Sequence, residues 1–400
     1  MAGGADRFIR HPAAQIIDGQ GQAVPAVVTA PAVIAALPSG PALAAALARG
    51  AQGLPFRIGA PDQPAPLPGP VPMLETLTSG SSGQPRRIWR SQASWCASFA
   101  VNAGLFGIGP GVAVAVLGRL DQSLSLYAAL EAAVLGAALH LMDALRPDRQ
   151  RAALAARRVA VLYATPAQLR ALAEAKGPVL GALRHVIVGG SKLDPGLRAA
   201  LGLAAPGAVL REFYGAAEAS FITLADATTP PESVGRPYPA VALRIGGGLA
   251  EGALGEVWVQ SPYVFTGYAG HDGSARWQDG WLSVGEMGWL QGGQLYLAGR
   301  AGRMVTVADQ NVFPEGIEAF LMTLPGVSRA AVLPRPDLRR GAVMLAVLQG
   351  DPAQEAAILR AARARFGPLV APRAVVWRRH WPELASGKTD LARLQIEVAP

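Results

Sequence analysis

Residues 78–87 read TSGSSGQPRR, in which hydroxyl side chains and glycines are followed by two arginines. Hydroxyls can bind phosphate oxygens, and glycines let the backbone turn its N–H groups towards an anion. The residues with these properties are Thr78, Ser79, Gly80, Ser81, Ser82 and Gly83. The stretch lacks the spacing and the lysine of a Walker loop. On its own it predicts either a phosphate-binding loop or a polar linker.

The chain has 400 residues, enough for two or three domains, and its hydrophobic content of 51% is typical of a globular protein. A single cysteine, Cys96, excludes internal disulfides and cysteine-rich zinc clusters and fits a cytoplasmic location. The N-terminus lacks the basic start and apolar block of a signal peptide. The most apolar stretch, 124–142, contains Glu131 and His140, so we expect a buried helix there and no membrane span.

The net charge of +8 is carried mainly by arginine, because the only lysines are Lys176, Lys192 and Lys388. The arginines are scattered along the chain apart from short pairs such as Arg157 and Arg158. A nucleic-acid-binding protein more often concentrates its basic residues on one face or helix. The abundance of alanine, glycine, proline and arginine is explained more simply by a GC-rich genome. We therefore expect no nucleic-acid partner.

Apolar runs alternate with helical stretches through the middle of the chain, which predicts an α/β domain with a mostly parallel sheet. Strands are expected at 112–118, 159–165, 183–190 and 208–215. Proline excludes regular helix and central strand from residues 53–72. We expect this stretch to connect a small, alanine-rich N-terminal part to the first strand of the main domain.

After about residue 230, short strands separated by glycine turns predict an antiparallel sheet or a small barrel. From Met304 onwards the pattern is that of a compact α+β domain. Its expected elements are strand 304–307, helix 314–323, strands 327–333 and 342–349, helix 352–366 and strand 373–377. The predicted fold class is therefore α/β, with a large N-terminal domain of mixed α/β sheets, a small barrel-like part and a small α+β C-terminal domain.

Nine short motifs occur in order along the chain, and together they resemble the adenylate-forming superfamily, the AMP-forming acyl-CoA synthetases and their relatives. The first resembles that family's TSG(S/T)TGxPK loop, and the fourth resembles its YGxTE motif. The nine are LTSGSSGQPR (77–86), LYATPAQLRAL (162–172), VIVGGSKLDPGL (186–197), REFYGAAEAS (211–220), VGRPYPAVALRI (234–245), GEVWVQSPYVFTGY (255–268), DGWLSVGEMGWLQGGQLYLAGR (279–300), NVFPEGIE (311–318) and ASGKTDLARL (385–394). Each motif is weak alone, but the ordered set across residues 73–394 is very specific.

The resemblance implies that a substrate carboxylate attacks the α-phosphate of ATP, expelling pyrophosphate and leaving an acyl-adenylate. It implies that the 78–83 loop holds the β- and γ-phosphates, that Glu218 holds Mg²⁺, and that Tyr214 stacks on the adenine. Glu286 takes the place of a ribose-binding aspartate, and Arg300 reaches the ribose or phosphate. The other residues implied in the nucleotide site are Arg86, Gly189, Gly190, Ser191, Glu212, Phe213, Gly215, Ala216 and Ala217.

Lys388 is implied, with Glu218, as a catalytic residue, because the resemblance brings it to the α-phosphate and carboxylate oxygen during adenylation. In the family, the C-terminal domain then rotates to bring another face over the site for thioester formation. Gly302 occupies the hinge position, and glycine tolerates the change in backbone angles. The expected domains are therefore residues 1–301, with the ATP and acyl sites, and a mobile lid of residues 302–400.

The sequence departs from the family pattern at several positions. The phosphate loop comes earlier in the chain, so much of the N-terminal subdomain is absent or reduced. Arg86 replaces the loop lysine, and Ala217 replaces the threonine of YGxTE. Near the hinge, Thr306 replaces a common lysine, Asp309 stands near a usual glycine, and Gly316 replaces the first glutamate of a PxE-I/V-E motif.

These features together predict a cytoplasmic ligase that activates a carboxylic acid with ATP and Mg²⁺ and passes the acyl group to a thiol. CoA is the expected acceptor. One alternative is a free-standing enzyme that loads the phosphopantetheine of a separate acyl carrier protein, which the Asp309 region favours. A further alternative is a degenerate protein that binds nucleotide or acyl-adenylate without turnover. The sequence leaves the acyl substrate open.

Overall fold

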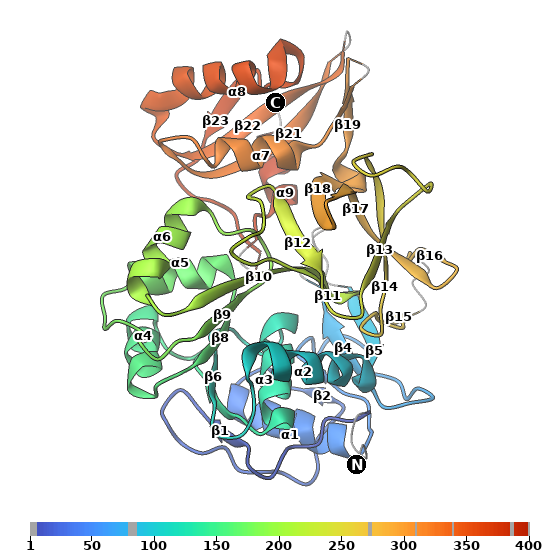
Figure 1. Cartoon of the computed structure of the whole chain (residues 1–400), viewed down its shortest axis with the longest axis vertical. Helices are drawn as coiled ribbons and strands as arrows, with labels where there is room; N and C mark the ends of the chain where they lie inside the picture. Colours follow the sequence, from blue (N-terminus) through green and yellow to red (C-terminus); the bar gives the residue numbers. More distant parts are fainter. Residues whose placement is uncertain are drawn as a thin grey trace. The chain divides into compact units, whose positions relative to one another are not determined.

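The structure is a computed structural model that describes residues 6–78, 86–270, 274–308, 310–337, 340–384 and 388–398. These residues form two compact units (Figure 1). The first unit contains the chain up to Thr78, residues Arg86–Leu243 and residues Val259–Leu282, and the second contains Arg244–Trp258 and Ser283–Pro400. The predicted domain limit after residue 301 and the hinge at Gly302 remain predictions.

A parallel sheet forms the centre of the first unit, as the alternation of apolar runs predicted. Neighbouring strands in it run in the same direction. In order across the sheet, the strands are β1 (Gln15–Ile17), β7 (Ala138–Leu141), β6 (Ala113–Val116), β8 (Val161–Ala164), β9 (His185–Val188) and β10 (Val209–Ala216). The four strands expected at 112–118, 159–165, 183–190 and 208–215 are β6, β8, β9 and β10.

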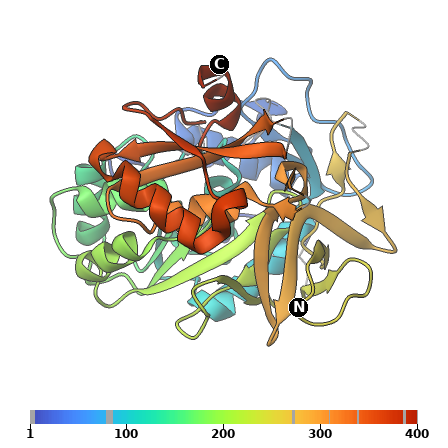
Figure 2. The same ribbon diagram turned by 90° about the horizontal axis from the view of Figure 1, so that it is seen from above.

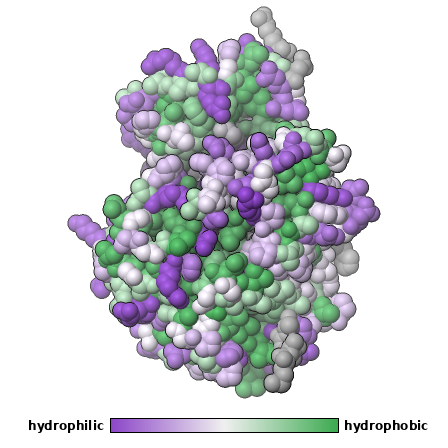
Figure 3. Space-filling model, viewed as in Figure 1, coloured by the Kyte–Doolittle hydropathy of each residue, from purple (hydrophilic) through white to green (hydrophobic). Residues whose placement is uncertain are grey.

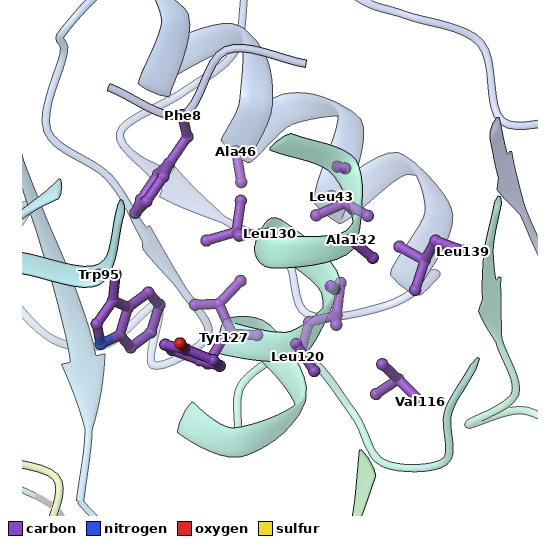
Figure 4. Packing of buried hydrophobic residues seen from close by; sticks show 14 of the residues in the cluster. Phe8, Leu43, Ala46, Trp95, Val116, Leu120, Tyr127, Leu130, Ala132 and Leu139 are labelled. Carbon is purple, nitrogen blue, oxygen red and sulfur yellow. The ribbon is translucent and has the colours of Figure 1, made fainter. Parts of the chain in front are cut away.

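Helices cover both faces of this sheet because its strands are apolar on both sides. On β8, Val161 and Tyr163 face one core and Leu162 and Ala164 face another. Figure 4 shows part of the first core, where Leu130 of the third helix lies beside the first helix. Helices α1 (Ser39–Ala51), α2 (Gln92–Phe106) and α3 (Ser123–Leu135) contribute to the first core, and α4 (Pro147–Ala156), α5 (Pro166–Glu174) and α6 (Pro195–Ala204) to the second (Figure 1).

The apolar stretch 124–142 is not one helix, so that prediction was wrong. Helix α3 ends at Leu135, and the chain then continues as strand β7. Gly136 makes the change possible, because its φ of 87° is in the left-handed region that favours glycine. A Cβ atom there would also lie 2.6 Å from His11 Nδ1. Hydropathy alone does not reveal this change, because helix and strand are both buried.

A second sheet in the first unit contains five strands within the described residues. One of its strands, Val33–Ile34, and β1 of the parallel sheet come from the N-terminal part that the sequence suggested was separate. The stretch 53–72 also contains a strand, so it is more than a connector. In order, the strands are β15 (Gly267–Tyr268), β5 (Arg87–Ser91), β4 (Met73–Leu77), β3 (Arg57–Ile58) and β2 (Val33–Ile34). Strands of two or three residues carry too little periodicity to be predicted.

The strands after residue 216 form open sheets. Of the two forms that the glycine-rich pattern allowed, the sheet is therefore the one found, and the described strands close no barrel. Strand β10 pairs antiparallel with β11 (Ser220–Leu224), which pairs with β12 (Ser233–Pro237). The other strands of this region are β13 (Ala242–Ile245), β14 (Gly255–Gln260), β16 (Trp277–Gln278), β17 (Trp281–Gln291) and β18 (Gln294–Arg300).

The end of the chain has the predicted α+β pattern. Strands β21, β22 and β23 form a three-stranded sheet. Helices α7 and α8 cover one face of it, where Ile317 and Ile358 join one core, and α9 covers the other face, where Leu394 joins a second core (Figure 2). The elements are β19 (Val305–Val307), β20 (Gln310–Val312), α7 (Pro314–Leu321), β21 (Val327–Asp337), β22 (Gly341–Gly350), α8 (Glu355–Val370), β23 (Ala374–Trp377) and α9 (Leu391–Glu397).

Among the described residues, no helix combines the length and the apolar character needed to cross a membrane. The stretch 124–142, the most apolar in the sequence, is divided between α3 and β7. On the face of the molecule shown in Figure 3, hydrophilic and hydrophobic residues are interspersed.

Candidate active site

Two of the predicted motifs lie side by side at the carboxyl ends of neighbouring parallel strands. In the register of β9 and β10, Val188 is paired with Glu212, so Gly189 and Phe213 are the next residues on their strands. Ligands of open α/β sheets bind at this edge, outside the carboxyl ends of the strands. The fold therefore positions the glycine turn and the YGAAE segment for a common ligand.

Close contacts explain why glycine occurs in both motifs: the aromatic ring of Phe213 at Gly189, and the Ser220 carbonyl oxygen, 2.2 Å from a Cβ atom, at Gly215. A Cβ atom on Gly189 would lie 2.3 Å from this ring, and one on Gly215 would lie 3.1 Å from it. The ring also lies against Phe221, with 4.1 Å between the ring centroids. Gly190 has a φ of 106°, which favours glycine for a different reason, the backbone turn. Packing alone therefore requires Gly189.

The predicted residues Glu212 and Ser191 have different surroundings. The Glu212 carboxylate accepts a hydrogen bond of 2.7 Å from the Leu193 N–H and pairs with Arg198. It thus anchors the turn that follows the two glycines. Ser191 is exposed on this turn, and Tyr214 is half-buried and pairs with Thr223 in the hairpin of β10 and β11.

Glu218 lies in the tight turn between β10 and β11, where Ala216 pairs with Ser220. Its backbone carbonyl accepts a hydrogen bond of 2.6 Å from the Phe265 N–H. Its carboxylate Oε1 accepts a hydrogen bond of 2.7 Å from Tyr268 Oη and lies 3.9 Å from Arg86 Nη2. Tyr268 was not among the predicted site residues, although the family-like segment GEVWVQSPYVFTGY ends at it.

The ends of the predicted phosphate loop are joined to each other. The Thr78 N–H donates to the Arg86 carbonyl at 2.9 Å, and the Arg86 N–H donates to Thr78 Oγ1 at 2.8 Å. The Arg86 guanidinium lies over the Tyr268 ring, 4.3 Å from its centroid. Arg86, which follows the loop, therefore has its side chain near Glu218. Ser79, Gly80, Ser81, Ser82 and Gly83 lie outside the described residues.

The donor set at Glu218 fits Mg²⁺ in a site that is completed by substrate. Mg²⁺ is usually held by one or two carboxylates together with phosphates and water, and seldom by a cage of protein ligands. In the described part of the chain, no group of three acidic, histidine or cysteine residues could hold a metal by itself. Tyr268 orients the Glu218 carboxylate through Oε1, and the carboxylate is partly exposed.

Three other predicted residues come together within the second unit. Glu286 and Arg300 are paired across β17 and β18, with 3.3 Å between Oε1 and Nε. Burial raises the pKa of Glu286, while the charges of Arg300 and Lys388 lower it. Lys388 is exposed, and its charge acts on Glu286. Asp309 lies outside the described residues.

Arg303 has two acidic partners that the sequence did not reveal. Its guanidinium is 3.2 Å from Glu315 and 2.7 Å from Glu318, and these charges raise the pKa of Arg303. Glu318 also accepts a hydrogen bond of 2.8 Å from the Val332 N–H. Both glutamates belong to the PEGIE segment, in which Gly316 replaces a glutamate of the family pattern.

Comparison with known proteins agrees with this arrangement. Residues 11–269 match the model of the AMP-binding enzyme family, and residues 316–388 match the AMP-binding enzyme C-terminal domain. The chain belongs to the AMP-binding enzyme family. The predicted superfamily is therefore confirmed, and the two matches follow one another in the order in which the motifs occur.

Relatives of this AMP-binding enzyme include the uncharacterized acyl–CoA ligase YhfT of Bacillus subtilis, which is 32% identical over 78% of this chain and 66% of YhfT. The amide bond synthetase McbA of Marinactinospora thermotolerans is 28% identical, with a TM-score of 0.71 over 82% of this chain and 69% of McbA. The o-succinylbenzoate CoA synthetase of Bacillus subtilis, solved with its acyl-adenylate intermediate, has the same fold at 22% identity, with a TM-score of 0.73 over 82% of this chain and 69% of that chain. The chain spans 57–66% of the length of curated acyl-CoA ligase relatives.

Proposed function

We propose that this chain activates a carboxylic acid with ATP and transfers the acyl group to a thiol. In the first step a carboxylate oxygen bonds to the α-phosphorus, and the bond from that phosphorus to pyrophosphate breaks. In the second step the thiol sulfur bonds to the acyl carbon, and AMP leaves. The observation that carries the proposal is the Glu218 carboxylate, held by Tyr268 beside Arg86 at the carboxyl edge of the sheet.

Phosphoryl transfer of this kind depends on positioning and charge neutralisation more than on covalent help from the protein. The bound Mg²⁺ would neutralise charge on the phosphates. Glu218 would hold this cation, and Arg86 would supply the positive charge of the missing loop lysine. Tyr214 and the turn formed by Gly189, Gly190 and Ser191 would enclose the adenine.

Three further predicted residues would bind the ribose and the α-phosphate. Glu286 would accept hydrogen bonds from the ribose hydroxyls, and Arg300 would orient Glu286 and reach the ribose or phosphate. Lys388 would reach the α-phosphate and the carboxylate oxygen. Lys388 is an exposed residue, and its charge acts on Glu286.

CoA is the proposed acceptor, because YhfT is an acyl–CoA ligase by name and is 32% identical to this chain. The phosphopantetheine of an acyl carrier protein is an alternative thiol. An amine is a further candidate acceptor, favoured by the 28% identity to an amide bond synthetase. We place the reaction in the cytoplasm, in agreement with the single cysteine, Cys96.

Pyrophosphate exchange with a panel of carboxylic acids tests the proposal. We expect ATP labelling that depends on one class of acid, followed by product formation with CoA in the presence of that acid. If product forms with a carrier protein or an amine and none forms with CoA, that molecule replaces CoA as the proposed acceptor. ATP binding without exchange for any acid would instead support a degenerate binding protein, the alternative favoured by the loss of the motif threonine at Ala217.

A further inference from the structure

Arg90 is a fully buried arginine directly behind the turn that carries Glu218, with an exposed fraction of 0%. Its Nη1 donates to Ser220 Oγ at 2.6 Å and to the Tyr263 carbonyl at 3.4 Å, and its Nη2 donates to the Ala217 carbonyl at 2.6 Å. Among the described residues, no carboxylate forms an ion pair with Arg90. Its Nε is buried without a hydrogen-bond partner.

A buried cation without a contacting carboxylate is costly, because the charge loses its hydration. This cost is visible in the pKa of Arg90, which burial lowers to about 10 although the charge of Glu218 opposes the change. An apolar side chain would avoid the cost. The presence of an arginine at this position therefore calls for a role that its charge or its forked donors perform.

The turn that Arg90 holds has an unfavourable backbone conformation. Ser220 has a φ of 57°, which non-glycine residues adopt only when surrounding contacts fix them. A Cβ atom on Gly215 would lie 2.2 Å from the Ser220 carbonyl oxygen, so the hairpin is closed as tightly as its backbone allows. Arg90 is one of the residues that maintain this conformation.

The Arg90 guanidinium lies against a residue of the hydrophobic core, Trp95. The Trp95 ring lies 5.2 Å from the Arg90 guanidinium carbon, and Trp95 Nε1 donates to the same Ser220 Oγ at 3.2 Å. Trp95 in turn packs against Tyr127 of α3, as Figure 4 shows, with 5.2 Å between ring centroids. The turn is thus connected through Arg90 and Trp95 to the hydrophobic core.

Strand β5 brings two arginines to the same turn. Arg86 precedes the strand and Arg90 lies within it, and their even spacing of four residues favours the same side of an extended chain. Arg86 approaches the Glu218 side chain, whereas Arg90 binds the backbone carbonyl of Ala217 and the hydroxyl of Ser220. The Arg90 guanidinium therefore binds one group before Glu218 in the sequence, the Ala217 carbonyl, and one after it, the Ser220 hydroxyl.

We propose that Arg90 is a positioning residue for adenylation, holding the 217–220 turn so that Glu218 presents its carboxylate to the divalent cation of the nucleotide. The inference rests on the proposed function, because the cation is the one that accompanies ATP. It gives a physical role to Ala217, which supplies a carbonyl acceptor to Arg90 in a motif that has lost its threonine hydroxyl.

Replacement of Arg90 by lysine tests the inference, because lysine keeps the charge but lacks the planar fork that binds two acceptors. We expect Arg90→Lys to weaken the binding of Mn²⁺ in the presence of ATP by about tenfold, as for other residues that orient a metal ligand. Electron paramagnetic resonance of the bound Mn²⁺ measures this affinity. The Mg²⁺ concentration for half-maximal exchange should rise similarly, with the KM of the acid unchanged.

Arg57→Lys is the matched control. Arg57 is also fully buried and lies in the same sheet, but it pairs with Glu75 at 2.5 Å and binds the carbonyls of Gly59 and Ala60. The substitution Arg57→Lys should lower the midpoint of thermal unfolding while leaving Mn²⁺ binding unchanged. If Arg90→Lys also lowers the midpoint and leaves Mn²⁺ binding unchanged, Arg90 is only structural and the inference is overturned.

Ser220→Ala is the second variant, used if Arg90→Lys does not fold. It keeps Arg90 but removes one of its acceptors, and we expect weaker Mn²⁺ binding in the same direction, whereas unchanged binding would contradict the inference. The two proposals can fail separately. Unmodified protein that binds Mn²⁺ with ATP but shows no exchange would overturn the proposed function alone. Absence of cation-dependent ATP binding would overturn both.

Discussion

The Glu286 carboxylate and the Arg300 guanidinium face each other across strands β17 and β18, with 3.3 Å between Oε1 and Nε. Glu286 is largely buried, with 15% of its side chain exposed, whereas Arg300 is 46% exposed. Burial raises the pKa of Glu286 and the charge of Arg300 opposes this rise. The arrangement holds the Glu286 carboxylate beside the Arg300 guanidinium.

We expect Glu286→Gln to weaken ATP binding by about 10- to 100-fold, which is the usual size of a lost hydrogen bond to a charged group. An amide retains an acceptor oxygen but loses the charge. Glu286→Asp, which restores the residue type of the family, is the control and should retain most of the affinity. The KM for ATP in pyrophosphate exchange is measured for both variants. Equal KM values for the two variants would argue against a role of Glu286 in binding the ribose.

Glu131 predicts a pH dependence of stability. Burial raises its pKa from 4.5 to about 7, partly offset by hydrogen bonds from Tyr163, Asn102 and Tyr127. Since the folded state then binds a proton more tightly than the unfolded state, the contribution to stability is fully present below pH 4.5 and is lost as the pH rises to about 7. Its size is roughly 3 kcal/mol at most.

Glu131→Gln tests this prediction, because glutamine keeps an acceptor for Tyr163 but does not ionise. Urea unfolding at several pH values between 4.5 and 7 should give a free energy of unfolding that depends less on pH for the variant than for the unmodified protein. Parallel pH curves for the two proteins would show that Glu131 does not titrate in this range.

The apolar runs and the order of the motifs along the sequence predicted much of this fold. Contacts between residues far apart in the sequence were known only from the structure. The strands before Gly189 and Tyr214 were found because they are long apolar runs, and the motifs after them identified the family. Tyr268 ends the family-like segment GEVWVQSPYVFTGY, but its contact with Glu218 could not be predicted, because 50 residues of sequence separate the two. Arg90 resembled any other arginine in the sequence until its burial was known.

Lys388→Ala should reduce pyrophosphate exchange by a factor on the order of 10²–10³, the usual loss when a charge that stabilises the transition state is removed. The affinity for ATP, measured by equilibrium binding, should change much less. Lys176→Ala is the control, because Lys176 is also an exposed lysine and lies outside the motifs. If Lys388→Ala retains pyrophosphate exchange, Lys388 has no catalytic role in adenylation.

Gly302 is the predicted hinge, and its surroundings allow a sharp test. It lies in the short 3₁₀ turn Ala301–Arg303, and a Cβ atom there would meet no atom within 4 Å. Its φ is outside the left-handed region, so this conformation does not require glycine. Gly302→Ala should therefore leave the thermal midpoint unchanged.

Gly302→Pro should separate the two half-reactions. Proline fixes φ near −65°, which removes the freedom that a rotation of the C-terminal domain needs. We expect pyrophosphate exchange to be retained and thioester formation with CoA to fall at least tenfold, because only the second step requires the rotation. Single-turnover measurements starting from the enzyme-bound acyl-adenylate isolate that step. If both steps fall equally, proline has perturbed the site itself; if neither falls, the hinge lies elsewhere in the chain.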